Sequence, residues 1–195
     1  PLKALDDKYK IKRVVYSTYQ AVSGSGVKGV EDLEKGMNGN PTGFYPHQIS
    51  YNCLPHIDSF TENGYTKEEM KMVNETMKIL DNYDLKITAT TVRVPVKNGH
   101  SESINVEFNN PFELDDLVKT LEEAPGVVVV DNPAKNEYPT AVEFDDRDEV
   151  FVGRIRRDFS VDNGVNLWVV ADNIRKGAAT NAIQIAEMAL SYDLV

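Results

Sequence analysis

The chain has 195 residues, of which 31 are acidic and 21 are basic, and its formal net charge is -10. This charge argues against a nucleic-acid or anionic-membrane surface, because both require a basic stripe, whereas a small anionic substrate needs only a few local cations. The sequence has no apolar run as long as a membrane span and no signal-peptide pattern. Its single cysteine, Cys53, excludes an internal disulfide framework and a cysteine-rich zinc site. We therefore expect a cytoplasmic domain that binds no nucleic acid, membrane or metal.

The first quarter of the chain predicts extended segments joined by loops. Residues 12–19 are rich in β-branched and aromatic side chains, which predicts a strand. The small residues at 20–26 predict a loop that could hold a phosphate or a carboxamide close to its backbone, and a plain turn is the alternative. A short helix is expected at 27–35 and a Gly-, Asn- and Pro-rich loop at 36–46. Weak alternation at 48–54 predicts another strand.

The clearest helix begins after Thr66. Thr66 and Glu69 have the spacing of a capping box, in which each side chain accepts a hydrogen bond from the backbone N–H of the other. The apolar stripe of this helix repeats at helical spacing and consists of Met70, Val73, Met77 and Leu80.

Residues 90–103 predict a β-hairpin that carries two groups suited to chemistry. A strand over 86–96 leads into Lys97-Asn98-Gly99, where Asn and Gly tolerate the positive φ of a tight turn. Apolar and polar residues alternate at 104–108, which predicts the second strand of the hairpin after His100. Arg93 on this strand and His100 at the turn would place a fixed cation beside a titratable imidazole. Such a pair can grip an anion and move a proton. The alternative is a surface hairpin whose arginine and histidine are only solvated.

The second half predicts a helix and then further strands. Asn110 is the expected N-cap and Pro111 the first helical residue, and Pro125-Gly126 should end this helix. The strands expected after it cover residues 127–130, 140–144, 150–159 and 165–171, and a final helix covers residues 176–190. Strands outnumber helices, so we predict a single α+β domain over residues 1–195, with a large mixed, mainly antiparallel sheet and helices on one face.

The cysteine, the other histidines and the charged pairs, considered one at a time, do not form a complete catalytic site. Cys53 has no cation or helix N-terminus near it in sequence, so we interpret it as a small buried hydrophobe within a strand. His47 and His56 lack an acidic or cysteine partner in register and predict no metal site. Glu68 and Lys71 lie three apart on a polar helix face, where spacing alone predicts an ordinary exposed ion pair.

Six stretches, taken together, resemble the aspartate-semialdehyde dehydrogenase family, and specifically its C-terminal catalytic and dimerisation domain. They occur in family order and span nearly the whole chain: STYQAVSGSG (17–26), LPHID (54–58), GYTKEEMKMVNETMKIL (64–80), TVRVPVKNGHSES (91–103), VGRIRRD (152–158) and NLWVVADNIRKGAATNAIQIAE (166–187). The resemblance implies the fold of the C-terminal domain of glyceraldehyde-3-phosphate dehydrogenase-like enzymes. It also implies NADP-dependent reductive dephosphorylation of L-aspartyl-4-phosphate to L-aspartate 4-semialdehyde and phosphate, in lysine, threonine, methionine and diaminopimelate biosynthesis.

The same resemblance implies a role for individual residues. His100 matches the acid/base histidine, and Gln20 matches the glutamine that orients the substrate near a reactive thiolate. Arg93 matches the arginine that clamps the substrate carboxylate, a task suited to a planar, two-pronged donor. Glu68 matches the acid that binds the substrate at its ammonium group, and Lys71 matches a phosphate-binding lysine. The positions that match cofactor contacts are Ser23, Gly24 and Asn173.

The resemblance also implies what this sequence lacks. The NADP-binding half and the nucleophilic cysteine, expected a few residues before Pro1, are not in the sequence, and Cys53 does not match that cysteine. We therefore expect the isolated chain to be inactive, to form a homodimer through its sheet, and to pack the helix at 176–190 on the nucleotide-binding half. The alternative is a non-enzymatic dimerisation or substrate-binding module, for which the full set of matched site residues would have no use.

Overall fold

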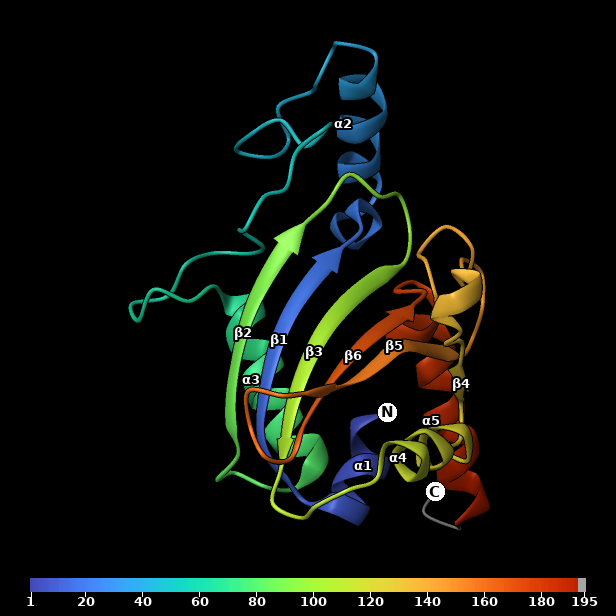
Figure 1. Cartoon of the computed structure of the whole chain (residues 1–195). Helices are drawn as coiled ribbons and strands as arrows, with labels where there is room; N and C mark the ends of the chain where they lie inside the picture. Colours follow the sequence, from blue (N-terminus) through green and yellow to red (C-terminus); the bar gives the residue numbers. More distant parts are fainter. Residues whose placement is uncertain (193–195) are drawn as a thin grey trace.

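The computed structural model describes residues 1–192 and contains a six-stranded mixed sheet (Figure 1). Along the sheet the strands run in the order β2-β1-β3-β6-β5-β4. The pairs β1–β2 and β4–β5 are parallel, and the other three pairs are antiparallel. The strands are β1 (Ile11–Gln20), β2 (Lys86–Arg93), β3 (His100–Phe108), β4 (Val127–Val129), β5 (Val150–Asp158) and β6 (Gly164–Ala171). The predicted α+β fold with a mixed, mainly antiparallel sheet is confirmed.

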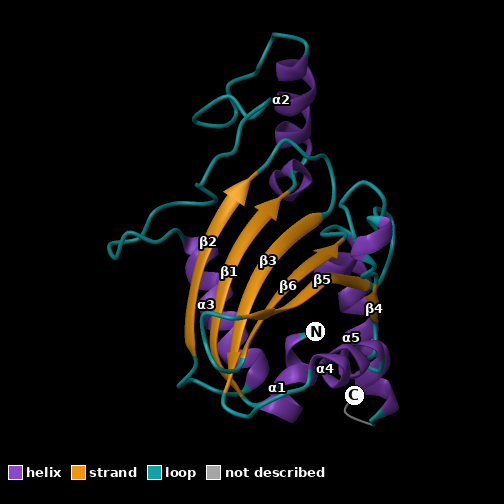
Figure 2. Ribbon diagram, viewed as in Figure 1, coloured by secondary structure: helices purple, strands orange, loops and turns teal. Residues whose placement is uncertain are grey.

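Three helices cover one face of this sheet, and the other face has no helix on it in the described chain (Figure 2). The covering helices α1, α3 and α4 contribute Leu5, Leu80 and Leu117 to the main hydrophobic core. Helix α2 lies beyond the end of the sheet, where β1 and β2 finish (Figure 1). The helices are α1 (Leu2–Tyr9), α2 (Val27–Met37), α3 (Lys67–Leu80), α4 (Leu114–Glu122) and α5 (Thr180–Ser191).

Strand register explains why polar groups gather at one end of the helix-covered face. Successive side chains on a strand point to opposite faces, so in-register residues form rows across the sheet. One row of the core consists of Tyr16, Ala89, Ile104 and Leu167. Four residues further along β1, Gln20 pairs with Arg93. His100 lies beside them, because it immediately precedes Ser101, the partner of Tyr19. The apolar core thus gives way to a polar row where β1 and β2 end and β3 begins.

The predicted hairpin is wrong, because β1 lies between β2 and β3. The connection after Arg93 does not close a tight turn but crosses the end of β1 and pairs with the segment that follows it. Val22 N–H donates to Val96 O, and Ser23 N–H donates to Lys97 O. Gly99 does adopt the expected positive φ, of 83°. An added Cβ there would lie 3.1 Å from Ala141, so both φ and space favour glycine.

The predicted strands at 48–54 and 140–144 are also wrong. In the first, only Leu54 forms a bridge, to Arg93, while Ile49 and Leu54 are buried in a second small core with Val22 and Leu33. The alternating apolar positions therefore reflect packing against α2 rather than a pleated strand. Cys53 is correspondingly exposed, not buried within a strand. Residues 141–146 form turns instead of a strand.

Helix boundaries differ from prediction at both ends of the chain. Helix α1 was not expected, although Leu5 and Tyr9 are buried one turn apart. Helix α4 begins after Glu113, so Asn110 and Pro111 do not cap it. Arg175–Ala179 form a π-helical turn before α5, which begins four residues later than predicted. In residues 1–192, no helix is long and apolar enough to cross a bilayer, and no group of three or more His, Cys, Asp or Glu side chains could hold a metal ion.

Candidate active site

A cavity of about 460 Å³ lies at the polar end of the sheet. It brings together all the predicted site residues except Ser23, which is hydrogen-bonded to Asn173 in the cavity wall. The lining comes from the ends of β1, β2 and β3, from the start of α3 and the loop before it, and from the segment that follows β6. Its residues are Gln20, Gly24, Ile57, Asp58, Glu68, Lys71, Arg93, His100, Asn173 and Gly177.

The first turn of α3 presents an acid and a base to this cavity. The capping box predicted there is formed: Glu69 N–H donates to Thr66 Oγ1 at 3.2 Å, and Thr66 N–H donates to Glu69 Oε2 at 2.8 Å. Gln20 Nε2 donates to Glu68 Oε1 at 3.2 Å, and Lys71 Nζ lies 3.7 Å from Glu68 Oε2. The Glu68 side chain is 20% exposed and that of Lys71 is 56% exposed. Glu68 is therefore held inside the site, whereas Lys71 is free to reach an anion.

Arg93 places a guanidinium in the cavity wall. Its backbone is fixed on both sides, because it pairs with Gln20 of β1 and exchanges two hydrogen bonds with Leu54. Nη1 donates to Ala21 O at 2.6 Å, and this is the side chain's one hydrogen bond within residues 1–192. Burial lowers the pKa of Arg93 from its ordinary value. The remaining N–H groups of this planar fork are available to a carboxylate.

His100 is held by the backbone of Ala21, the residue whose carbonyl binds Arg93. Ala21 N–H donates to His100 Nδ1 at 3.2 Å, which leaves Nε2 for the cavity. Burial, together with the charges of Arg93 and Lys71, lowers the pKa of His100 to about 4. The imidazole is therefore neutral near pH 7. Sequence reasoning missed Ala21, because its backbone rather than its side chain does this work.

Gly24 keeps open the space between the arginine and the histidine. A Cβ added at this residue would lie 3.1 Å from Arg93 Nη1 and 3.5 Å from His100 Nε2. Gly24 does not have a positive φ, so the reason for glycine here is the close approach and not backbone conformation. Any side chain would occupy the position from which a ligand could contact both groups.

Sequence reasoning also missed Glu102. It lies two residues after His100, and therefore on the same face of β3. His100 and Glu102 both line an adjacent, mainly apolar cavity of about 360 Å³. Burial raises the pKa of the Glu102 carboxyl to about 7. Alternation along HSES could have placed this residue beside His100, but the sequence could not show that its surroundings are apolar.

Comparisons with known proteins point to one family. A family model described as semialdehyde dehydrogenase, dimerisation domain, matches residues 2–176. The aspartate-semialdehyde dehydrogenase of Aquifex aeolicus is 53% identical over 201 residues, which cover all of this chain and 59% of the relative. The chain thus spans a little over half the length of the curated relatives it matches.

Two solved structures show the same fold. A crystal structure of aspartate semialdehyde dehydrogenase II from Vibrio cholerae, complexed with ASA, has a TM-score of 0.92 and 45% identity. It covers 97% of this chain, which corresponds to 58% of that protein. Aspartate semialdehyde dehydrogenase with NADP from Candida albicans has a TM-score of 0.73 and 27% identity, over all of this chain and 55% of that protein. The chain therefore belongs to the semialdehyde dehydrogenase family and corresponds to its dimerisation domain.

Proposed function

We propose that this chain is the catalytic domain of an NADP-dependent aspartate-semialdehyde dehydrogenase, which converts L-aspartyl-4-phosphate to L-aspartate 4-semialdehyde and phosphate. The observation that carries this proposal is the meeting of Arg93, Lys71, Glu68 and His100 in one cavity. The substrate has a carboxylate, an ammonium group and an acyl phosphate, so it needs two cationic partners and one anionic partner. The cavity offers that combination, and the relatives' names support the same substrate.

Each charged group has a distinct task in this proposal. Arg93, buried and fixed by the sheet, binds the α-carboxylate with its remaining N–H groups. Glu68 binds the ammonium group and is oriented by Gln20. Lys71 reaches the phosphate from its exposed position and stabilises its negative charge as it leaves. One helical turn and one sheet row thus contact both ends of the substrate.

In this proposal His100 is the hydrogen-bond donor that faces the reacting group of the substrate. Because Nδ1 accepts a hydrogen bond from Ala21, the neutral ring carries its proton on Nε2, the nitrogen left for the cavity. Nε2 can therefore donate to the substrate oxygen on which negative charge develops. Uptake of a second proton would have to occur at Nδ1 and would break the bond to Ala21, in keeping with the lowered pKa.

NADP would contact this chain at Ser23, Gly24 and Asn173. Exposed Gly24 lets a flat group approach the backbone, and the Ser23 hydroxyl and Asn173 amide offer both donors and acceptors. When bound, NADPH supplies the hydride of the reaction. The NADP-containing relative from Candida albicans supports this cofactor. Most of its binding site would belong to the part of the relatives that this chain does not cover.

The isolated chain should not turn over substrate, because Cys53 is exposed and does not line the cavity. The test compares this chain with the full-length product of its parent gene. The assay follows NADPH formation from aspartate 4-semialdehyde, phosphate and NADP. We expect turnover by the full-length enzyme, none by the chain, and no effect of Cys53→Ser on the full-length enzyme. Absence of turnover with the full-length protein, or robust turnover by the chain, would refute the proposal.

Arg93→Lys in the full-length enzyme tests the substrate assignment. Lysine keeps the charge but loses the planar fork, so kcat/KM for the semialdehyde should fall by roughly 30- to 1,000-fold, as expected for the loss of charged hydrogen bonds. Lys78→Arg, at an exposed position at the far end of α3, is the matched control and should leave kcat/KM unchanged. Equal effects of the two substitutions would contradict a role for Arg93 in carboxylate binding.

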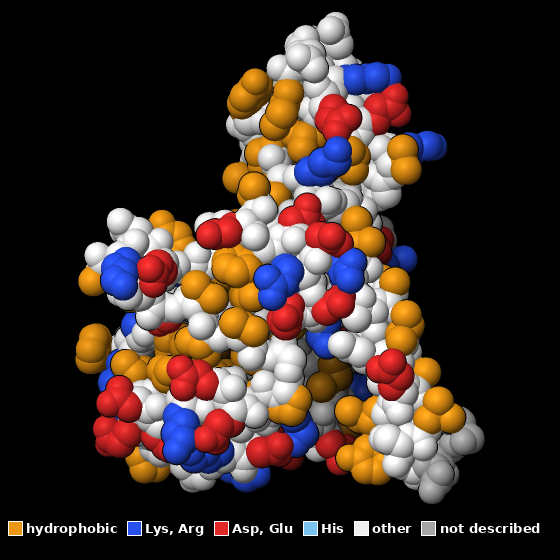
Figure 3. All heavy atoms as spheres, turned by 90° about the vertical axis from the view of Figure 1, so that its right-hand side faces the viewer, with side chains coloured by type: hydrophobic (Ala, Val, Ile, Leu, Met, Phe, Trp, Pro, Cys, Tyr) orange, Lys and Arg blue, Asp and Glu red, His pale blue; other side chains and the backbone are white. Residues whose placement is uncertain are grey.

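We also infer two protein contacts. The family description supports a homodimer, and the helix-free face of the sheet is the surface that fits it. Tyr19 and Trp168 pack on this face with ring centroids 5.6 Å apart, beside a cavity of about 690 Å³. The second contact is α5, which would pack on the nucleotide-binding part of a longer protein. Its exposed apolar side chains lie at the edge of the molecule (Figure 3); they are Ile183, Ile185, Met188 and Leu190.

A further inference from the structure

The side chain of Asn173 lies where three segments of the chain meet. Asn173 Oδ1 accepts a hydrogen bond from Gly99 N–H at 3.0 Å. Its Nδ2 donates to Ser23 Oγ at 3.0 Å, so one amide joins the turn at 22–25 to the backbone that precedes His100. Asn173 itself belongs to the segment that follows β6.

The Gly99 contact bears directly on His100. Gly99 is buried, has a φ of 83° and has Ala141 on its other side, where an added Cβ would come within 3.1 Å. The backbone before His100 is thus held by Asn173, while the imidazole ring is held by Ala21 N–H. These two fixed points together determine where Nε2 lies.

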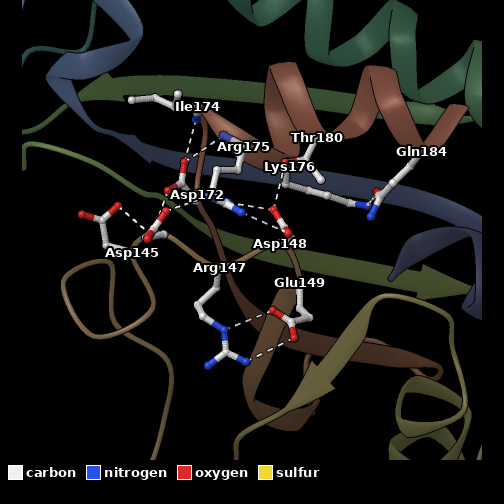
Figure 4. Close-up of polar contacts among 11 residues, drawn as sticks. Asp145, Arg147, Asp148, Glu149, Asp172, Ile174, Arg175, Lys176, Thr180 and Gln184 are labelled. Atoms are coloured by element: carbon white, nitrogen blue, oxygen red, sulfur yellow. Dashed lines mark hydrogen bonds and ion pairs between the residues drawn. The ribbon is translucent and has the colours of Figure 1, made fainter. Parts of the chain in front are cut away.

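The turn that carries Asn173 is anchored independently by its neighbour Asp172 (Figure 4). Asp172 is buried, and Oδ1 accepts from Ile174 N–H at 2.7 Å and from Arg175 N–H at 3.0 Å. Its Oδ2 accepts from Asp146 N–H at 2.9 Å. Arg175 in turn binds Asp148 through two nitrogens, at 2.7 and 3.2 Å. Because these contacts do not involve the Asn173 side chain, that side chain can be changed while the turn stays in place.

We propose that Asn173 is a positioning residue for His100. Its single side-chain amide links the Ser23 loop to the backbone of Gly99. The inference rests on the proposed function, in which Ser23 and Asn173 contact the cofactor. A cofactor that orders the Ser23–Asn173 pair then also orders Gly99 and His100. Cofactor binding and the position of His100 are coupled through this amide, because a single side chain makes both the hydrogen bond with Ser23 and the one with Gly99.

The first test uses the isolated chain and needs no activity. Asn173→Leu has nearly the same shape but can make neither hydrogen bond. Asn173→Asp loses the Nδ2 donor but keeps an acceptor for Gly99 N–H and for the Ser23 hydroxyl, which also donates to Asn173 Oδ1 at 3.2 Å. We expect the Gly99 amide of Asn173→Leu to exchange with solvent at least about 10-fold faster than in wild type, with altered ¹⁵N shifts of the His100 ring. Asn173→Asp should retain the protection of Gly99. Unchanged Gly99 exchange in Asn173→Leu would overturn the proposal; if leucine is not accommodated, Asn173→Ala takes its place.

The second test uses the full-length enzyme and separates positioning from cofactor binding. Asn173→Leu should lower kcat at saturating NADP by about 10- to 100-fold, the effect of a displaced catalytic group. Ser23→Ala keeps the Gly99 bond, so its main effect should be on KM for NADP. Equal kcat losses in Asn173→Leu and Asn173→Asp would contradict a role through Gly99. If the wild-type enzyme lacks dehydrogenase activity, the proposed function fails, but the exchange of Gly99 still decides the role of Asn173.

Discussion

His100 is surrounded by groups that oppose its protonation. Burial acts first, and the positive charges of Arg93 and Lys71 add to it, so the pKa falls to about 4 from an ordinary value near 6.5. A folded-state pKa below the unfolded one means that the neutral ring stabilises the fold. This contribution is complete above about pH 6.5 and is lost as the pH falls toward 4.

We predict that the His100 ring titrates near pH 4 in the folded chain, measured by ¹⁵N and ¹³C NMR of labelled histidine. Arg93→Gln should raise the midpoint, because it removes one of the nearby positive charges. Lys78→Gln removes a charge at the far end of α3 and should leave the midpoint unchanged. A midpoint at or above 6.5 in the wild-type chain would show that the imidazole is solvated, as in the alternative interpretation of the sequence.

The contribution of Glu102 to stability changes with pH in the opposite direction to that of His100. Burial is the largest cause that raises its pKa to about 7, and the negative charge of Glu68 on α3 adds to it. A folded-state pKa above the unfolded one means that stability is greatest at low pH. The free energy of unfolding should therefore fall as the pH rises from about 4.5 to 7.

We predict that Glu102→Gln removes this slope. Glutamine imitates the protonated acid, so the variant should be more stable than wild type at pH 8, by at most about 3 kcal/mol, and little different at pH 5. Urea unfolding at both pH values measures this. Glu75→Gln on the exposed side of α3 is the control. An equal difference from wild type at both pH values would mean that Glu102 is not the group that titrates.

Among the helices and strands, the type of each segment could be predicted from the sequence more reliably than the strands that pair with one another. The β-branched run at 12–19 and the alternation after His100 identified β1 and β3 correctly. The turn chemistry around Gly99 is also real, since this residue has a positive φ. The error was to pair 86–96 with 100–108 as neighbours, because no local signal tells that β1 inserts between them. Arg93 and His100 still reach one cavity, across β1 rather than across a turn.

The N-terminus of α3 was fully readable, because a capping box is a local pattern. The part that this helix end plays in the site could not be predicted in the same way. Spacing alone indicated only that Glu68 and Lys71 form an ordinary surface ion pair. Their role as cavity walls depends on Gln20, which lies 48 residues earlier and donates to Glu68. Long-range contacts of this kind carry most of the candidate site, and only the family resemblance reached them from sequence.

We predict that Thr66→Ala destabilises the chain by about 1 kcal/mol, the usual effect of removing a helix N-cap. Thr66 is buried, and its hydroxyl accepts from Glu69 N–H, so alanine leaves that donor without a partner. Chemical denaturation measures the loss. Lys67→Ala changes the next residue, which is exposed, and should have a much smaller effect. Similar losses in both variants would indicate that the cap does not stabilise α3.

At the scale of the molecule, the sheet has one face buried by helices and one face that no helix of residues 1–192 covers. The helix-free face carries a row of small and aromatic side chains at its centre, which consists of Thr90, Ser17, Ser103 and Trp168. Small side chains allow a second sheet to approach closely, and the cavity beside Trp168 offers apolar surface to bury. A two-fold axis through this face would bring the same row of each copy together.

We predict that the wild-type chain is a dimer at micromolar concentration and that Ser103→Arg makes it a monomer of 21.8 kDa, measured by light scattering coupled to size exclusion. Ser103 lies in the middle of β3, paired with Ser17 on one side and Trp168 on the other, so an arginine there would meet its own copy across the axis. Repulsion and lost close packing would then oppose association. Asn74→Arg adds the same side chain to an exposed position of α3 and should leave the dimer intact. A dimeric Ser103→Arg variant would place the interface elsewhere, and a monomeric wild type would refute the homodimer itself.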